Sequence, residues 1–138
     1  MSDGIGRFAF SPGRSGPVVE LLPDGVSCRI CEPWVYVSSD GHHWAIPAGW
    51  ESDGASIPQM FWSKVGSPMT GKYRNAALVH DYLYHSHPID PATGVMLTKE
   101  RADRLLLDAM YACGLEDHVL AETIYGAVRA AGFVAWAT

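Results

Sequence analysis

The spacing of apolar residues changes near Tyr73, and this change constrains the fold more than any other feature of the chain. Upstream of Tyr73, short runs of β-forming residues, such as residues 34–37, are separated by turns. Downstream, apolar residues such as Ala77, Leu83 and Tyr84 recur at steps of three and four, which is typical of a helix. We therefore expect an α+β fold, with a small N-terminal antiparallel β-sheet, a long loop, a helical hairpin and a C-terminal helix.

The chain has 138 residues, which is most simply one domain (residues 1–138) with room for a sizeable core. Residues 1–17 are rich in Gly, Ser and Pro and are expected to form a loose N-terminal arm. The β-sheet is expected over residues 18–47 and the helical part over residues 73–138. Residues 48–72 are irregular, and a loop of this length inside a compact domain is usually functional or covers something.

The expected elements follow from turns, caps and breaks in the sequence. Two hairpins each join two β-forming runs around a glycine turn: residues 18–22 with 26–30 across Gly25, and residues 34–37 with 43–47 across Gly41. The first helix begins near Tyr73 and ends at His87, because the residue before a proline avoids the helical region. The second helix runs from an N-cap at Thr98 to a stop at Gly114, and the last covers about residues 116–134. The buried face of the second helix is expected to be Ala102, Leu105, Leu106, Ala109 and Met110.

Composition argues against several classes of protein. The net charge of −5 and the scattered Lys and Arg argue against a nucleic-acid binder, which normally carries a basic stripe. No apolar core of a signal peptide is evident, and no apolar stretch is long enough to span a bilayer. Cys28 and Cys31 have the spacing of half a zinc site or of a redox pair, but Cys113 is alone. Reduced cysteines in a cytosolic compartment are therefore the favoured interpretation.

A candidate site lies in the first two expected helices. His80 and Tyr84 share a helix face because they are four residues apart, whereas Asp81 points toward a neighbouring face. If His80 faces the second helix, Asp103 can hold one ring nitrogen while the other takes a proton from water. Tyr84 can then donate its hydroxyl to Asp103, and Asp81 can bind a hard cation through oxygen. The alternative is a buried polar network in which the same side chains only stabilise the packing.

The segment that contains Asp53 and Ser56 offers a second source of oxygen ligands. A short Asp-Gly-Ala-Ser turn can direct backbone carbonyls and one carboxylate at a single point, as calcium requires. Alternatively, Asp53 only caps the turn through its own backbone. Trp62, further along this segment, belongs either to an interfacial aromatic patch or to the core of the loop.

Arg101 and two histidines complete the candidates. Arg101 could bind an anionic headgroup or only solubilise the surface. It lies in the first turn of its helix, where a cation is unfavourable, and this indicates a specific partner such as Asp81 or Asp103. His85 and His87 could gather a soft metal, but the sequence offers no nearby cysteine or carboxylate to complete a set. Exposed histidines without a metal are therefore favoured at these positions.

Six short motifs are spread over residues 45–132: Ile46-Pro47-Ala48-Gly49, Ser52-Asp53-Gly54-Ala55-Ser56-Ile57-Pro58, Tyr73-Arg74-Asn75-Ala76-Ala77, His80-Asp81-Tyr82-Leu83-Tyr84, Ala102-Asp103, and Ala127-Val128-Arg129 with Gly132. Together they resemble a small phage and prophage family known as domain of unknown function thirteen-fifty-three. This resemblance implies an origin in a tailed phage or a prophage and no established activity. It also implies that the protein occurs in the host cytoplasm during phage expression, or in the virion.

A narrower resemblance concerns His80-Asp81-x-x-Tyr84 followed by Ala102-Asp103, which is similar to the helical core of phospholipase A(2), particularly the short forms in viral capsid proteins. In that family the histidine is the general base that activates water, and the next aspartate binds calcium. The tyrosine and the later aspartate orient the histidine. The chain lacks the family's glycine-rich calcium loop and the disulfides of its secreted members, so we take the turn at Asp53 as a hypothetical replacement for that loop.

Two functional hypotheses follow. The first is a calcium-dependent hydrolase of phospholipid esters. In this hydrolase, His80 would be the base, and Asp103 and Tyr84 would orient it. Asp81 and Asp53 would bind the cation. The substrate would be contacted by Arg101, Trp62 and Ser56. The second is a non-enzymatic virion or tail-associated protein that contacts other virion proteins and in which the cluster is a structural network. A catalytic His80 must open onto a cleft, whereas a structural one can be sealed.

Overall fold

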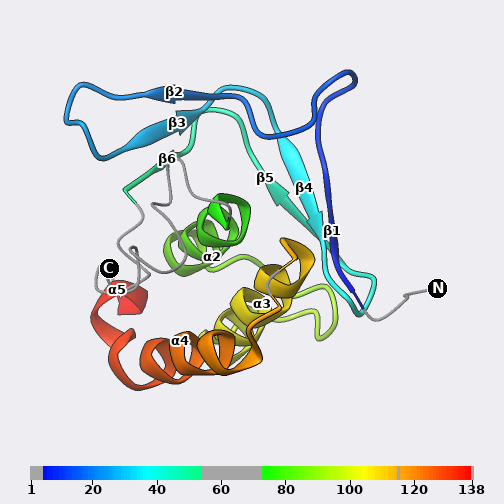
Figure 1. Cartoon of the computed structure of the whole chain (residues 1–138), viewed down its shortest axis with the longest axis vertical. Helices are drawn as coiled ribbons and strands as arrows, with labels where there is room; N and C mark the ends of the chain where they lie inside the picture. Colours follow the sequence, from blue (N-terminus) through cyan, green and yellow to red (C-terminus); the bar gives the residue numbers. More distant parts are fainter. Residues whose placement is uncertain (1–4, 54–72, 115, 138) are drawn as a thin grey trace.

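The computed structural model describes residues 5–53, 73–114 and 116–137, and it has the α+β architecture expected from the sequence (Figure 1). Strands occupy the first part of the chain and helices the remainder. Figure 1 shows α2 (Arg74–Ser86) in the middle of the molecule, with the strands on one side and α4 (His118–Ala131) on the other. In the part of the chain that is described, no helix has both the length and the hydropathy that a membrane crossing requires.

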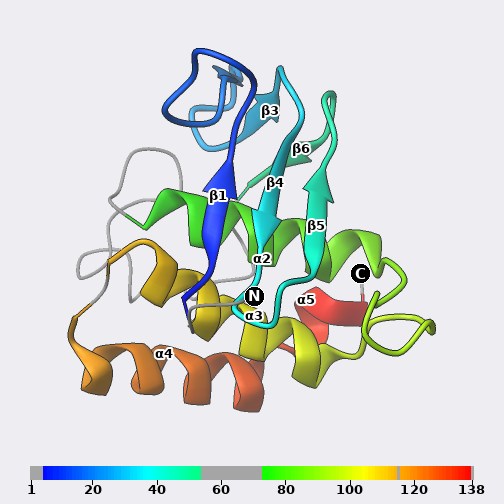
Figure 2. The same cartoon turned by 90° about the vertical axis from the view of Figure 1, so that its right-hand side faces the viewer.

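The described strands form two three-stranded antiparallel sheets, whereas the sequence predicted a single sheet. One sheet has the order β1-β4-β5, seen side by side in Figure 2, and the other has the order β2-β3-β6. Both predicted hairpins are confirmed, since β2 pairs with β3 and β4 pairs with β5. The strands are β1 (Arg7–Ala9), β2 (Val19–Leu21), β3 (Cys28–Ile30), β4 (Trp34–Val37), β5 (His43–Ile46) and β6 (Glu51–Ser52).

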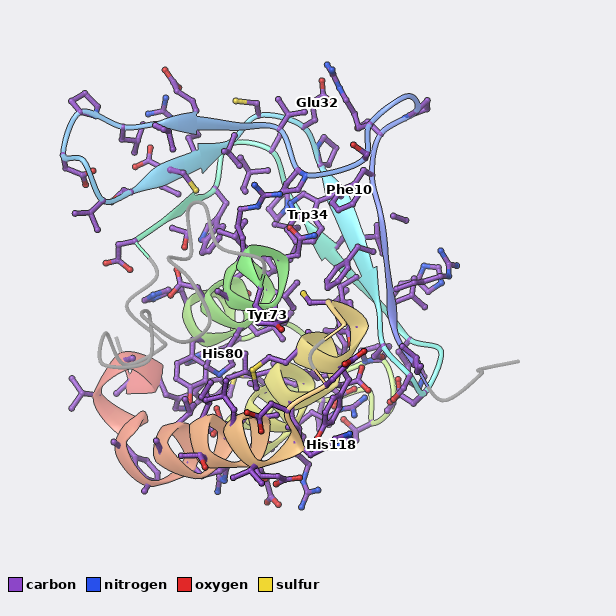
Figure 3. The ribbon with its side chains drawn as sticks, in the orientation of Figure 1. Phe10, Glu32, Trp34, Tyr73, His80 and His118 are labelled. Atoms are coloured by element: carbon purple, nitrogen blue, oxygen red, sulfur yellow. The ribbon has the colours of Figure 1, made fainter. Side chains whose placement is uncertain are left out.

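Strand β1 lies in the segment that was predicted to be a loose arm, and that prediction is wrong for this strand. The reason is aromatic packing, because the ring of Phe8 lies 5.2 Å from the ring of Tyr36 and 6.1 Å from that of Trp34. Phe10 adds a further contact with Trp34 at 5.5 Å, and Figure 3 shows these two rings together beside β4. Ring pairs at such distances stabilise the packing of two strands beyond the area that they bury.

Strand β6 lies in the predicted functional loop, and it is the strand that matters for the site. Its two residues pair with Arg29 and Cys28 of β3. Glu51 is exposed and forms an ion pair with Arg29 at 2.9 Å, whereas Ser52 is buried, as the alternation of side chains along a strand requires. The chain therefore leaves β6 with Ser52 pointing toward the helices.

The described helices after the sheets are α2, α3 (Lys99–Ala112), α4 and α5 (Phe133–Ala137). Helix α3 begins at the predicted N-cap, where Thr98 Oγ1 accepts a hydrogen bond from the Arg101 N–H at 3.1 Å. It stops before Gly114, whose φ of +92° suits glycine. The predicted helix over residues 116–134 is in fact interrupted at Gly132, where the backbone passes against Tyr84.

The core lies between the sheets and the helices, with α2 packed on α3 and α3 packed on α4. All five residues of the predicted buried face of α3 are buried. Large, fully buried apolar side chains come from both halves of the chain, and they include Trp34, Ile46, Leu78, Leu106 and Ile124. Each such side chain contributes roughly 1.5–3 kcal/mol through its removal from water, so the strands and helices depend on one another for burial.

The end of α2 positions the C-terminal helix. His87 has a left-handed backbone (φ +45°), and its N–H donates to the Leu83 carbonyl at 3.2 Å. Its ring stacks on the indole of Trp136 in α5, with 3.8 Å between ring centroids. Trp136 also contacts Tyr84 edge to face at 5.4 Å, so α5 is held against the last turn of α2.

We expect Gly132→Ala to lower the free energy of unfolding by about 1–3 kcal/mol. A Cβ atom at this position would lie 2.6 Å from the Tyr84 hydroxyl and 2.6 Å from the Val128 carbonyl oxygen. Gly126→Ala, inside α4, is the matched control. Among the described residues a Cβ at Gly126 meets no neighbour within 4 Å, so this change should raise stability by about 0.5–1 kcal/mol. Urea denaturation of both variants measures the difference, and equal effects would contradict the close approach at Gly132.

Candidate functional site

Helix α2 presents two polar faces to different parts of the fold. His80 and Tyr84 point toward α3, and Figure 3 shows His80 on the side of α2 that faces the other helices. Asp81 and His85 lie on the face next to β6. Each pair is four residues apart and so shares one helix face. Two adjacent residues therefore belong to two separate groups of side chains.

The first group, which we call the Asp103 cluster, consists of His80, Tyr84, Lys99, Asp103 and Arg129. Asp103 Oδ1 accepts hydrogen bonds from His80 Nε2 at 3.0 Å and from the Tyr84 hydroxyl. Asp103 Oδ2 accepts hydrogen bonds from Lys99 Nζ at 2.9 Å and from Arg129 Nη1 at 3.0 Å. Because the donors come from α2, α3 and α4, one carboxylate joins three helices. The predicted grouping of His80, Tyr84 and Asp103 is confirmed as geometry.

Lys99 and Arg129 are members of the cluster for which the sequence analysis assigned no role. Lys99 is nearly buried, and its Nζ also donates to the carbonyls of Val128 and Arg129 at 3.0 and 3.2 Å. The ammonium group therefore satisfies the last carbonyls of α4 as well as Asp103. Lys99 precedes Asp103 by four residues on one helix, and this spacing is the signal that could have identified it.

The centre of the Asp103 cluster is sealed from solvent, with exposed fractions of 0% for His80, Tyr84 and Asp103, whereas Arg129 reaches it from the surface. Burial lowers the pKa of His80 below 6.5 and outweighs the opposing effect of Asp103, so the imidazole is neutral near neutral pH. Burial opposes the ionisation of Asp103, but hydrogen bonds from His80, Tyr84 and Lys99 outweigh it and lower the pKa of Asp103 to about 2. By the criterion that a catalytic histidine opens onto a cleft, His80 can act as a base only if the side chains that cover it move.

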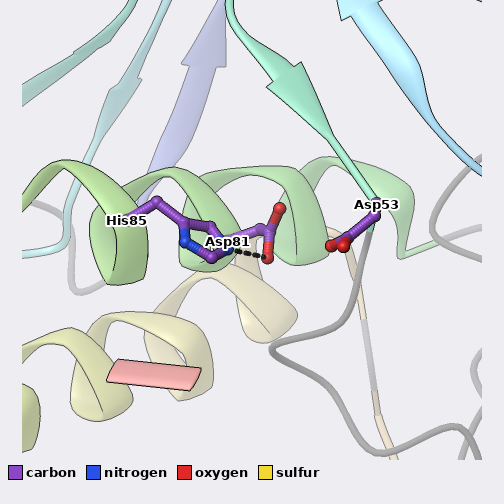
Figure 4. A group of neighbouring side chains, drawn as sticks. All are labelled: Asp53, Asp81 and His85. Carbon is purple, nitrogen blue, oxygen red and sulfur yellow. Dashed lines mark ion pairs between the residues drawn. The ribbon is translucent and has the colours of Figure 1, made fainter. Parts of the chain in front are cut away.

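The second group lines a pocket of about 290 Å³ between β6, the start of β3 and α2, which we call the Asp81 pocket. The described residues that line it are Ser27, Glu51, Ser52, Asp53, Asp81 and His85. Figure 4 shows Asp81 and His85 along one side of α2, with the carboxylate of Asp53 directed toward Asp81. One ligand atom from each of these three residues lies within 4.8 Å of the other two, which makes them a candidate set of metal ligands.

The carboxylate of Asp81 is buried but incompletely hydrogen-bonded. Its Oδ2 accepts a hydrogen bond from Ser52 Oγ at 2.6 Å. Its Oδ1 has no hydrogen-bond partner among the described residues and lies 3.4 Å from His85 Nε2. Burial, followed by the negative charge of Asp81, raises the pKa of the nearby Cys28 thiol. A buried carboxylate oxygen without a hydrogen bond is costly, and a bound cation would remove that cost, so the pocket fits a divalent ion.

The expectation that nothing completes a metal set with His85 is wrong. Asp81, one turn earlier on α2, supplies one carboxylate, and Asp53, directly after β6, supplies another. The i, i+4 spacing of Asp81 and His85 could have indicated the first contact. The contribution of Asp53 depends on the pairing of β6 with β3, which the sequence does not reveal. Asp81 and Asp53, the two predicted cation ligands, are nevertheless brought together.

The expected partners of Arg101 are also wrong. Its Nε donates to Asp90 at 3.1 Å and its Nη2 to Asp40 at 2.5 Å, rather than to Asp81 or Asp103. The guanidinium joins the β4–β5 turn to the segment before α3, and it does not line the Asp81 pocket. Its role in binding a substrate stays a prediction, and the other two predicted substrate contacts, Trp62 and Ser56, lie outside the described residues.

Comparison with known proteins identifies a family. The model of the family described as Protein of unknown function (DUF1353) matches residues 28–128, which include the central strands of both sheets, β6, the helices α2 and α3, and most of α4. Both the Asp103 cluster and the Asp81 pocket draw most of their residues from this range. The family predicted from the sequence motifs is thereby confirmed. No solved structure matches the chain.

Two relatives, both from Sinorhizobium fredii, are themselves described as uncharacterized. Protein y4jT is 37% identical over 73 residues, which cover 53% of this chain and 21% of y4jT. Protein y4iH is 35% identical over 81 residues, which cover 59% of this chain and 30% of y4iH. The chain therefore aligns with less than a third of the length of either relative.

We expect the stability of the protein to fall on acidification because of His80 and Asp103. The pKa of His80 is lowered on folding, so its contribution is complete above pH 6.5 and is lost as the pH falls toward its folded-state pKa. Asp103 contributes about 2 kcal/mol above pH 3.8, which is lost as the pH falls to about 2. Urea denaturation at a series of pH values measures both losses of stability. If His80→Gln lost as much stability as the wild type between about pH 7 and pH 5, the expected contribution of His80 would be contradicted.

We expect Asp103→Asn, but not Asp81→Asn, to lower stability in metal-free buffer. Asp103→Asn leaves Lys99 without its buried counter-ion and should lower the free energy of unfolding by about 3 kcal/mol or more. Asp81→Asn removes a buried charge whose Oδ1 has no hydrogen bond, so the variant should match the wild type or exceed it by up to about 1 kcal/mol. Thermal and urea denaturation compare the two isosteric changes, and a loss at Asp81 equal to that at Asp103 would count against a ligand role for Asp81.

Proposed function

This chain belongs to the family described as Protein of unknown function (DUF1353), and we propose that it is a divalent-cation-dependent hydrolase of phospholipid ester bonds encoded by a tailed phage or a prophage. One observation carries the proposal. A single turn of α2 holds His80, oriented by Asp103, next to Asp81, whose buried carboxylate offers an oxygen without a hydrogen bond to a pocket. The phospholipid substrate and the phage origin are supported by the resemblances of the sequence motifs.

The residues of this site would divide the work as follows. Asp81 and Asp53 hold the cation, for which calcium is the expectation from the sequence. When bound, the cation would stabilise the negative charge that develops on the ester oxygen. Asp103 and Tyr84 fix the ring of His80, and Nδ1 is the ring nitrogen that Asp103 does not hold. His80 takes a proton from the attacking water at Nδ1, and the ionised Asp103 stabilises the resulting imidazolium. The imidazolium then gives this proton to the leaving alkoxide as the ester C–O bond breaks.

A second candidate function is supported by a different observation. His80 has no exposed surface, and the hydrogen bonds that Asp103 accepts come from described side chains of three helices. This arrangement suits a virion-associated or tail-associated phage protein in which the Asp103 cluster only stabilises the helices and the contacts of interest are with other virion proteins. For the hydrolase, by contrast, the side chains that cover His80 must move when a lipid binds.

Fatty-acid release from anionic phospholipid vesicles tests the proposal. The assay compares added calcium, added zinc and a chelator, with wild type, His80→Gln, Asp81→Asn and His118→Gln. Removal of a general base typically lowers the rate by at least about a hundredfold, so we expect His80→Gln to lose cation-dependent release to that extent. In Asp81→Asn, added cation should no longer increase fatty-acid release. His118→Gln is the matched control, because His118 is exposed on α4 and lies against Tyr111.

The two candidate functions predict different results in this assay. The absence of fatty-acid release by the wild type with any added cation, together with a large loss of stability in His80→Gln, would overturn the hydrolase and support the structural protein. Release that survives in a folded His80→Gln variant would overturn the role of His80 as base. Circular dichroism of each variant at the assay temperature establishes that it is folded.

A further inference from the structure

We infer that Asp53, Asp81 and His85 form a binding site for a first-row transition ion, zinc above all, rather than a site for calcium. The inference deepens the proposed function, on which it rests for the use of this pocket, because it names the ion and adds His85 as a ligand. It concerns the Asp81 pocket and does not involve the sealed Asp103 cluster.

The separation of the ligand atoms matches a tetrahedral ion. His85 Nε2 and Asp81 Oδ1 are 3.4 Å apart, and all three ligand atoms lie within 4.8 Å of one another. Two ligand atoms bound to zinc at about 2.0–2.1 Å lie about 3.3 Å apart when the geometry is tetrahedral. Asp81 and His85 are therefore already spaced as two ligands of one zinc ion, and Asp53 supplies a third ligand atom within 4.8 Å of both.

The state of Asp81 is an independent indication of a ligand. Its side chain is fully buried, and it faces the pocket with an Oδ1 that has no hydrogen-bond partner among the residues described. Ser52 holds the other oxygen at 2.6 Å, which fixes the direction in which Oδ1 points. Hydrogen bonds of this kind, from a neighbour to the far atom of a ligand, are typical of metal sites.

The ligand types favour zinc over calcium. Calcium is bound by six to eight oxygen atoms, and an imidazole nitrogen is a poor ligand for it. One imidazole and two carboxylates suit zinc and its neighbours in the first transition row, and zinc is among the tightest of these ions. Three protein ligands leave a fourth position open, and here it would face the 290 Å³ pocket, where water or a substrate oxygen could enter.

Isothermal titration calorimetry of the chelator-treated protein with zinc and, separately, with calcium tests the inference. We expect one zinc ion per chain and an affinity for zinc at least about tenfold above that for calcium. His85→Gln and Asp53→Asn should each lower the zinc affinity at least about tenfold, since even the loss of an outer partner of a ligand costs that much. His118→Gln, which removes an exposed histidine outside the pocket, should bind zinc like the wild type.

Substitution with cobalt(II) adds a spectroscopic measurement that does not depend on activity, because a tetrahedral site gives a visible absorption band that His85→Gln should lose. Zinc binding that is unchanged in both His85→Gln and Asp53→Asn, or a calcium affinity equal to that for zinc, would overturn the inference. Zinc bound through His85 without any lipid hydrolysis would support the site and overturn the proposed function. Calcium-dependent hydrolysis without zinc binding would support the proposed function and overturn the zinc site.

Discussion

The ionised carboxylate of Asp103 is the interaction on which the arrangement of the helices depends. A buried carboxylate is costly unless charged and hydrogen-bonding partners surround it, and here the partners come from three helices. These contacts fix the rotation of α2 about its own axis. With His80 and Tyr84 directed at α3, Asp81 and His85 must face β6. The Asp103 cluster therefore sets the geometry of the Asp81 pocket, although its residues do not line that pocket.

The sheet β2-β3-β6 positions the side of the Asp81 pocket that lies opposite α2. Arg29 of β3 forms ion pairs with Glu20 of β2 at 2.6 Å and with Glu51 of β6 at 2.9 Å on the exposed face of the sheet. Exposed pairs of this kind contribute little to stability individually. Their effect is on register, because once Glu51 points outward, Ser52 must point inward to Asp81. Two residues of strand are thus enough to direct a serine, and the aspartate after it, at the helix.

The sequence was sufficient to predict those features that depend on local spacing. The helical period, the cap at Thr98 and the stop at Gly114 place α2 and α3 to within a few residues. The i, i+4 spacing then brings His80 and Tyr84 to one face, where Asp103 can meet both. These predictions succeed because neighbours on one helix are set by the geometry of the helix itself.

Features that depend on contacts between distant segments could not be predicted in the same way. The short strands β1 and β6 carry little β-forming signal of their own and exist because Phe8 packs on Tyr36 and because Glu51 pairs with Arg29. The partners of Arg101 come from a turn and a loop that lie beside α3 only after folding. The proximity of Asp53 to His85 has the same origin, since it requires β6 and α2 to be placed first.

The origin of the pocket's ligands has one more consequence. Asp53 follows the sheet and Asp81 belongs to the helical half, so an ion held between them would be a cross-link that only the native chain can form. By mass action, the free concentration of that ion would then enter the folding equilibrium, and stability would rise with its logarithm once the concentration exceeds the dissociation constant. The free concentration of the metal in the surrounding compartment would then affect the fraction of the protein that is folded.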